Sequence, residues 1–211
     1  MELMKLIEEG NWHVFVCGLT QSGKSYFSHR AMLGISVGVL YMNVQGEKVP
    51  RGFVTVYANR IEPDQLIEML RDGVKINLVF SDTRKALDYF VGTVLNMLMD
   101  AGFDEDYYIY IGLEECHLYR GYSKEIADYV STSGLKKGIR LISISQRPAT
   151  CSKTIYSLAF AHYIFFISEA DREYMKSKGI DYEGCKPLWG DPKSHKYVYF
   201  DGYTLEGRPA I

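Results

Sequence analysis

Short apolar runs alternate with amphipathic stretches along most of this chain. The runs hold five to seven residues, and several are apolar on both faces, as strands buried inside a sheet are. Alternation of such runs with stretches of helical period is typical of β-α units stacked on a parallel sheet. The pattern predicts an α/β fold with a mostly parallel central sheet flanked by helices, whose strands cover residues 12–17, 37–43, 53–57, 75–80, 107–113, 139–145, 162–167 and 196–200.

The stretches between the strands carry helix ends. Pro63 suits the first turn of a helix that Gly73 closes. Ser81 or Asp82 can cap a long helix over residues 83–101. Its apolar stripe consists of Leu87, Phe90, Val91, Val94, Leu95 and Leu98. Further helices are expected over residues 26–33, 123–134 and 169–178, and after a tight turn at residues 201–202 we expect a tail that packs on a neighbour or frays.

Composition limits the class of protein. With 211 residues, 47% apolar and 24% charged, the chain is expected to form one globular domain over residues 1–211, and disordered or fibrous classes are excluded. It has no uninterrupted apolar run of eighteen residues and no signal-peptide pattern, so we expect no transmembrane segment and an intracellular protein. The four cysteines lack a C-x-x-C pair, which favours reduced thiols over zinc and leaves a disulfide open for a hyperthermophilic host.

The most informative motif follows the first predicted strand directly. Residues 18–25 read G-L-T-Q-S-G-K-S, a complete match to the phosphate-binding pattern G-x-x-x-x-G-K-[ST]. Glycines let the backbone curl so that N–H groups point at a phosphate, while Lys24 supplies a cation to the β- and γ-phosphates and the Ser25 hydroxyl binds Mg²⁺. The residues expected to contact ATP are Gly18, Thr20, Gln21, Ser22, Gly23, Lys24, Ser25 and Tyr26.

A second motif is the acidic pair Glu114 and Glu115, which ends the predicted strand 107–113. In open α/β sheets, ligands bind at the carboxyl ends of the strands. We therefore expect Glu114 to face Mg²⁺ and Glu115 to act as the general base on water. For His117, two residues further on, the sequence leaves a structural role and a contact with the acidic pair or a neighbouring subunit open.

The third motif is Gln146, at the end of the predicted strand 139–145. An amide both donates and accepts hydrogen bonds, so Gln146 can report whether the γ-phosphate is present. Together with Lys24 and Glu115 it completes the expected catalytic set. The alternative is a polar strand end before the turn that Pro148 starts.

Charge is balanced overall but uneven along the chain. The net charge is −2, whereas the stretch from residue 129 to 168 contains no Asp or Glu and carries Lys136, Lys137, Arg140, Arg147 and Lys153. A solvated basic face explains such a stretch, and so does a surface that meets the phosphates of nucleic acid.

Taken in this order and at this spacing, the three motifs resemble the FtsK-HerA branch of P-loop ATPases. Within it they resemble the genome-packaging ATPases of membrane-containing icosahedral viruses, including turreted viruses of archaea. The matching segments are residues 18–25, 109–117 and 138–148, with weaker similarity at 163–166 and 171–174. The likeness spans roughly residues 10 to 180, and the Gln-Arg-Pro of residues 146–148 discriminates best, because many ATPases share the other two motifs.

This resemblance implies a RecA-like core of the ASCE type, Mg²⁺-dependent ATP hydrolysis, and assembly into a ring of five or six copies. It also implies translocation of double-stranded DNA without sequence preference, recruitment by a capsid, portal or membrane-vertex protein, and residence in the host cytoplasm or at a capsid vertex.

The chain departs from the family at two places. The first acidic residue is usually Asp there and is Glu114 here, and an Arg that often follows the glycine matched by Gly134 is replaced by Leu-Lys-Lys. Lys136, Lys137, Arg140 and Arg147 therefore remain as candidates for DNA contacts or for action on a neighbouring copy's site. Two other readings stay open: a P-loop kinase of a small acceptor, and a nucleotide-gated assembly protein like those of filamentous phage secretion.

Overall fold

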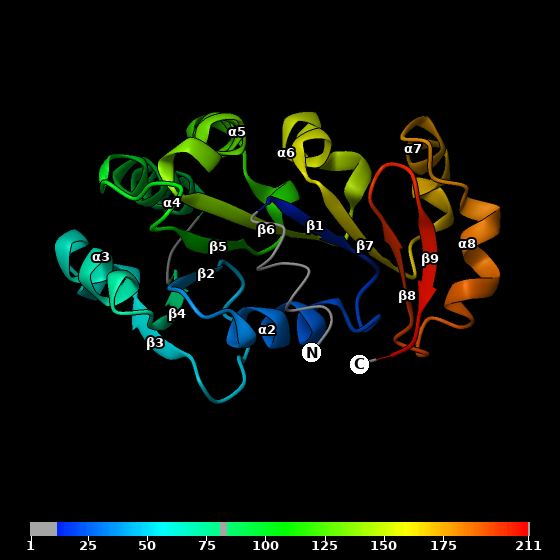
Figure 1. The fold of residues 1–211 in the computed structure, drawn as a ribbon, viewed down its shortest axis with the longest axis horizontal. Helices are drawn as coiled ribbons and strands as arrows, with labels where there is room; N and C mark the ends of the chain where they lie inside the picture. The colour runs from blue at the N-terminus through cyan, green and yellow to red at the C-terminus, as the bar shows by residue number, and fades with distance from the viewer. Residues whose placement is uncertain (1–11, 81–83, 211) are drawn as a thin grey trace.

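A computed structural model describes residues 12–80 and 84–210, with the side chains of residues 84–90 left out. Within these ranges nine strands form one sheet in the order β3-β4-β2-β5-β6-β1-β7-β8-β9 (Figure 1). The seven strands from β3 to β7 in that order are parallel, and β8 and β9 are antiparallel to their neighbours. The predicted mostly parallel α/β sheet is confirmed.

Each predicted strand is present, and no end differs from the prediction by more than two residues. Apolar runs locate strands, whereas hydrogen bonding to neighbours sets where each one ends. The strands are β1 Val14–Cys17, β2 Val39–Asn43, β3 Val54–Tyr57, β4 Lys75–Val79, β5 Ile109–Leu113, β6 Ile139–Ser145, β7 Ala161–Phe165, β8 Tyr197–Phe200 and β9 Leu205–Arg208.

Strand β9 corrects the prediction for the end of the chain. Instead of fraying or leaving for a neighbour, Leu205–Arg208 pairs antiparallel with β8. Asp201 stabilises the predicted turn, because its carboxylate accepts the backbone N–H groups of Tyr203 and Thr204 at 3.0 and 2.7 Å. The segment is short and polar, so no apolar alternation marked it as a strand.

The predicted helices are also present, and the described residues contain two more, α6 before α7 and α8 after it. The helices are α2 Lys24–Gly34, α3 Pro63–Arg71, α4 Arg84–Asp100, α5 Gly121–Ser133, α6 Lys153–Leu158, α7 Arg172–Ser177 and α8 Tyr182–Trp189. The sequence did not predict α6, which is only six residues long, or α8, which contains Pro187. The predicted caps Ser81 and Asp82, and the side chains of Leu87 and Phe90, lie outside what is described.

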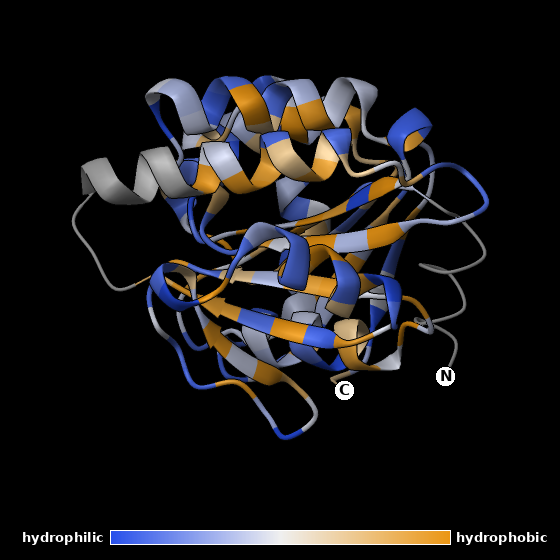
Figure 2. Ribbon diagram, turned by 90° about the vertical axis from the view of Figure 1, so that its left-hand side faces the viewer, coloured by the Kyte–Doolittle hydropathy of each residue, from blue (hydrophilic) through white to orange (hydrophobic). Residues whose placement is uncertain are grey.

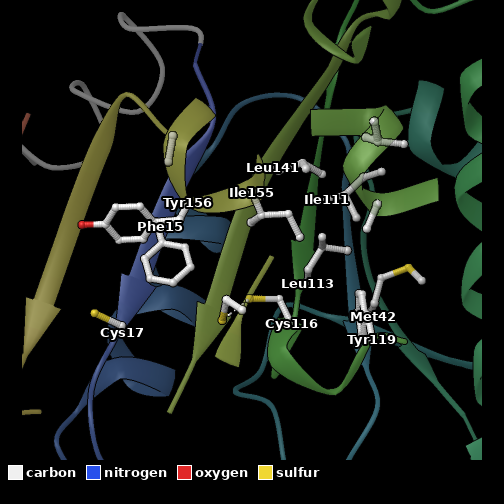
Figure 3. Packing of buried hydrophobic residues seen from close by; sticks show 14 of the residues in the cluster. Phe15, Cys17, Met42, Ile111, Leu113, Cys116, Tyr119, Leu141, Ile155 and Tyr156 are labelled. Atoms are coloured by element: carbon white, nitrogen blue, oxygen red, sulfur yellow. Dashed lines mark hydrogen bonds between the residues drawn. The ribbon is translucent and has the colours of Figure 1, made fainter. Parts of the chain in front are cut away.

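Successive side chains of a strand point to opposite faces of the sheet, so the core is divided between these two faces. On β1, Phe15 and Cys17 belong to a cluster with α3 to α8, while Val14 and Val16 belong to a second cluster with α2. Figure 2 shows helices on both sides of the apolar strands, and Figure 3 shows the larger cluster, where Tyr156 of α6 packs on Phe15 at 5.1 Å between ring centroids.

Helix α2 packs very closely on the second face. Gly112 of β5 permits this approach, because a Cβ atom there would lie 2.7 Å from the sulfur of Met32. This contact lies in the last turn of α2, while the first turn follows the loop at the carboxyl end of β1. Among the described residues, no helix combines the length and apolar character needed to cross a bilayer.

Candidate functional site

The loop between β1 and α2 is attached to both neighbouring strands. The N–H of Gly18 donates to the carbonyl of Ser145 on β6 at 3.2 Å, and the N–H of Leu19 donates to the carbonyl of Phe166 after β7 at 2.8 Å. The loop is therefore held at the end of β1, at the edge where all seven parallel strands end.

Two glycines in this loop are required by its shape. A Cβ atom on Gly18 would lie 2.6 Å from both Phe165 Cβ and Ser22 Oγ. Gly23 has φ +99°, a conformation that side chains other than hydrogen disfavour. The loop thus has the tight, concave backbone that the sequence motif predicts.

Two polar groups of the loop suit an anionic ligand. The Ser22 hydroxyl is buried and has no hydrogen-bond partner among the described residues. Lys24 is only 4% exposed, and its Nζ lies 3.7 Å from Oε1 of Glu115. A buried hydroxyl without a partner and a buried cation with one weak ion pair are groups that a phosphate would satisfy.

Glu115 is the centre of a connected set of groups. It leaves β5 in the left-handed conformation, with φ 44° and ψ 51°, which turns its side chain towards the loop and β6. Its carboxylate accepts the backbone N–H of Gln146 at 3.1 Å and a hydrogen bond from the Gln146 side-chain amide. His117 Nδ1 lies 3.1 Å from Glu115 Oε2. The structure thus brings the three predicted catalytic residues, Lys24, Glu115 and Gln146, into one cluster.

The environment of Glu115 keeps its carboxyl group ionised. Burial by itself would raise the pKa of Glu115, but the hydrogen bond from His117, the charge of Lys24 and the two N–H groups of Gln146 outweigh it and lower this pKa below its usual value. An ionised carboxylate is the form that can accept a proton.

Contacts of His117 and Thr20 with this cluster were not assigned by the motifs. His117 also lies 3.1 Å from Ser145 Oγ, and this hydroxyl accepts the backbone N–H of Arg147 at 3.0 Å. Thr20 of the loop donates to the side-chain oxygen of Gln146 at 2.6 Å. Gln146 therefore bridges the loop and Glu115, and His117 contacts the acidic pair, one of the roles left open above. The sequence gives no sign of the Ser145 contacts, because serines at strand ends are common. They become visible only once β6 is paired with β5.

Glu114 contacts β2 and the segment that follows it rather than β6. Its carboxylate accepts the N–H of Gln45, after β2, at 3.0 Å, and it is 3% exposed. Burial, together with the nearby charges of Glu47 and Glu115, raises the pKa of Glu114 to about 7, although hydrogen bonds from Gln45 and the Tyr41 hydroxyl lower it. Adjacent glutamates thus have opposite electrostatic environments.

The segment after β2 that holds Glu114 is itself fixed. Asn43 donates to the side chain of Asn77 at 2.9 Å and to the carbonyl of Glu47 at 2.7 Å, while its own oxygen accepts the Glu47 N–H at 2.8 Å. The sequence did not predict the buried pair of Asn43 and Asn77. Asn43 ends a strand, where asparagine is an ordinary turn residue.

The residues expected to bind the metal are Ser25 and Glu114, a hydroxyl and a carboxylate of the kind that Mg²⁺ prefers. No cluster of three His, Cys, Asp or Glu residues suited to a metal exists in the described part of the chain. Mg²⁺ bound with a nucleotide needs only one or two protein groups, because phosphates and waters complete its shell. The Ser22 hydroxyl in the loop, which has no partner among the described residues, is consistent with such a ligand.

The basic stretch does not form one surface. Lys136 and Lys137 are exposed before β6, at the amino edge of the sheet, whereas Arg147 is exposed after β6, at the carboxyl edge. Seven strand residues, about 20 Å, separate them. Arg140 is 2% exposed, donates to the carbonyl of Leu135 and lies over the ring of Tyr108, so its expected contact with DNA or a neighbouring copy is wrong.

The four cysteines are buried and unpaired. Cys116 and Cys151 come within 3.5 Å of each other, sulfur to sulfur, beneath the ends of β5 and β6. This contact and burial raise the pKa of Cys116 well above its usual value.

No protein-family model matches the sequence, and no curated protein matches it either. Solved structures are similar in fold. The genome-packaging NTPase B204 of Sulfolobus turreted icosahedral virus 2, in complex with sulfate, superposes with a TM-score of 0.70 at 15% identity over 95% of this chain and 96% of that one. The same NTPase has been solved with AMPPCP and with ATP-γ-S.

Two further solved structures share the fold. The bacterial conjugative coupling protein TrwBΔN70 aligns with a TM-score of 0.65 at 10% identity, over 94% of this chain and 84% of that one. EssC (ATPases 2 and 3) from Geobacillus thermodenitrificans aligns at 0.61 and 10% identity, over 95% of this chain and 40% of that one. The chain has the P-loop ATPase fold of these structures, which confirms the predicted fold class.

Proposed function

We propose that this chain is an Mg²⁺-dependent ATPase that moves double-stranded DNA, and that it packages a viral genome into a preformed capsid. The observation that carries the proposal is the cluster in which Lys24 of the phosphate loop, Glu115 after β5 and Gln146 after β6 meet. Three neighbouring strands thereby deliver a phosphate cradle, an ionised base and an amide to one edge of the sheet.

In this proposal each residue of the cluster has a role that its contacts support. The backbone of residues 18–25 binds the phosphates, and Lys24 exchanges its partner Glu115 for the β- and γ-oxygens. Glu115, once free of Lys24, orients water and accepts its proton. Ser25 and Glu114 would hold Mg²⁺, which would supply positive charge against the charge that develops on the phosphates. Gln146, bonded to both Thr20 and Glu115, links the state of the loop to the state of the base.

The breadth of the likeness to B204 supports the packaging role. B204 is named a genome-packaging NTPase, and its chain and this one cover each other almost completely. We propose that residues 1–211 act as one motor domain, in a ring of five or six copies around DNA, recruited by a capsid, portal or membrane-vertex protein in the host cytoplasm or at a capsid vertex.

A phosphate-release assay with and without linear duplex DNA tests this proposal. A motor releases phosphate from Mg-ATP and does so faster when duplex DNA is added, whatever its sequence. Turnover that ignores DNA would contradict translocation. Transfer to a soluble acceptor would instead identify a kinase, and ATP binding with negligible turnover would identify a nucleotide-gated assembly protein.

A further inference from the structure

The loop between α8 and β8 places one histidine on the phosphate loop. The backbone of Gly23 lies so close to His195 that a Cβ atom on the glycine would be 3.2 Å from His195 Cβ and 3.3 Å from its ring carbon Cγ. These residues are 172 positions apart in sequence. His195 is exposed, and so are two residues near it in the sequence, Lys193 and Lys196.

His195 is held there by an ordered turn. Asp191 accepts the N–H of Lys193 at 2.7 Å with its carboxylate and the N–H of Ser194 at 3.0 Å with its carbonyl, and the Ser194 hydroxyl donates to the carbonyl of Trp189. Trp189 is fully buried and donates to the carbonyl of Ile164 on β7 at 2.6 Å. The turn is therefore fastened to the strand beside the loop.

The backbone of His195 is strained. It has φ +54°, in the left-handed region that residues other than glycine rarely adopt. Such strain persists only where the surrounding structure imposes it, and it is concentrated at functional sites. Position and strain are two separate observations on the same residue.

The direction of a bound nucleotide follows from the site already described. Its γ-phosphate must face Glu115 and Gln146, which lie on the β5 and β6 side of β1. The nucleoside end then extends towards the other side of β1, where β7 and β8 are. His195 immediately precedes Lys196 and β8, on that side.

We propose that His195 contacts the base of the bound nucleoside triphosphate and contributes to selection of a nucleotide over other polyphosphates. Imidazole is flat and aromatic, and stacking on such rings is a general way to hold a nucleobase. This inference rests on the proposed ATPase function, because it assigns a further residue to the same site.

Calorimetry with two probes, Mg-ATP and inorganic Mg-tripolyphosphate, tests this proposal. Comparison of the two affinities separates the contribution of the base from that of the phosphates. His195→Asn removes the ring, while asparagine tolerates the left-handed backbone. We expect the dissociation constant for Mg-ATP to rise about five- to hundredfold, as loss of one stacked base predicts, with tripolyphosphate binding unchanged. Lys193→Gln, a change on the same turn, is the matched control and should alter neither constant appreciably.

Each other outcome has a definite meaning. Equal loss for both probes would overturn the proposal in favour of a phosphate contact or a structural role, and no loss for Mg-ATP would also overturn it. If the unaltered chain binds neither probe, the ATPase proposal fails as well. Thermal unfolding of His195→Asn, expected to match the unaltered chain, checks that the turn is intact.

Discussion

The two edges of the central sheet differ in what their buried polar groups do. At the carboxyl edge, Lys24, Glu115 and Gln146 meet in contacts that a ligand can replace, and the nearby Ser22 hydroxyl lacks a partner among the described residues. At the amino edge, His13 is saturated: it accepts the N–H of Leu141 at 3.0 Å on Nδ1, and its Nε2 lies 2.9 Å from the carbonyl of Ser131.

The contrast assigns chemistry to one edge and structure to the other. His13 joins β1, β6 and α5 through a neutral ring, because Nδ1 must accept while Nε2 donates. Exchangeable contacts among charged groups allow a cycle, whereas saturated contacts fix the strands that present the site. Changes at the carboxyl edge should therefore alter turnover, and changes at the amino edge should alter stability.

The largest effect is expected for Glu115→Gln. Glutamine keeps the shape but cannot accept a proton, so turnover should fall by about 10²–10⁴-fold. Binding of Mg-ATP should persist, because the phosphate loop is untouched. Phosphate release and equilibrium binding measured on the same preparation check both parts, and normal turnover would remove Glu115 from the mechanism.

The matching change at the amino edge is His13→Ala. It leaves the Leu141 N–H and the Ser131 carbonyl buried without their partner, which should lower the free energy of unfolding by about 2–4 kcal/mol. Denaturant titration measures this loss. ATP turnover by the molecules that remain folded should stay within about twofold at low temperature, and a selective loss of turnover would break the division between the edges.

Acid should unfold the protein partly through the same histidine. Burial lowers the pKa of His13 to about 4, while in the unfolded chain it is near 6.5. The unfolded state then binds more protons between these values, so the stabilisation present above pH 6.5 is lost as the pH falls towards 4, by at most about 3 kcal/mol. Unfolding followed from pH 7 to 4.5 should show a shallower decline for His13→Ala, and equal slopes would contradict the assignment.

A smaller effect of opposite sign is expected for Glu114→Gln in metal-free protein. The raised pKa of Glu114, about 7, means that its contribution to stability is present at low pH and lost as the pH rises from about 4.5 through 7. At pH 8 glutamine should therefore stabilise the fold by about 1–3 kcal/mol, and the gain should vanish near pH 4.5. With Mg-ATP the same variant should bind the metal less tightly. A variant less stable than the unaltered chain at pH 8 would overturn this electrostatic description.

The smallest effect concerns the exposed basic residues on the two edges. If Lys136 and Lys137 contact DNA phosphates, changing both to glutamine should reduce the salt dependence of DNA binding by about two counterions. Arg147→Gln, at the other edge, is the comparison. DNA binding measured at several salt concentrations tests this contact. An unchanged salt dependence of DNA binding for the double variant would show that DNA binds elsewhere on the protein.

The sequence predicted the fold and the centre of the site because both depend on local patterns. Apolar runs located eight of the nine strands in the described part of the chain, and G-x-x-x-x-G-K-S placed the phosphate loop at the end of β1. Because parallel strands end at the same edge of a sheet, the end of β6 was expected to lie near Glu115. Gln146 contacts Glu115 there.

What the sequence missed depends on pairing between distant residues. His195 reaches Gly23 only because α8, β7 and β8 fold back beside β1, and no local motif encodes that. Arg140 was misjudged because β6 is buried on both faces, so a charge in it turns inward to Tyr108 and Leu135. Strand β9 was missed because pairing with β8, rather than its own composition, makes it a strand.

A crystal structure with Mg²⁺ and a non-hydrolysable ATP analogue tests the central claim most directly. The account predicts that the triphosphate lies in the loop of residues 18–25, that Lys24 has left Glu115 for the phosphates, and that Glu115 and Gln146 face the γ-phosphate. An analogue bound elsewhere, or a phosphate-filled loop with Glu115 turned away from it, would contradict the account.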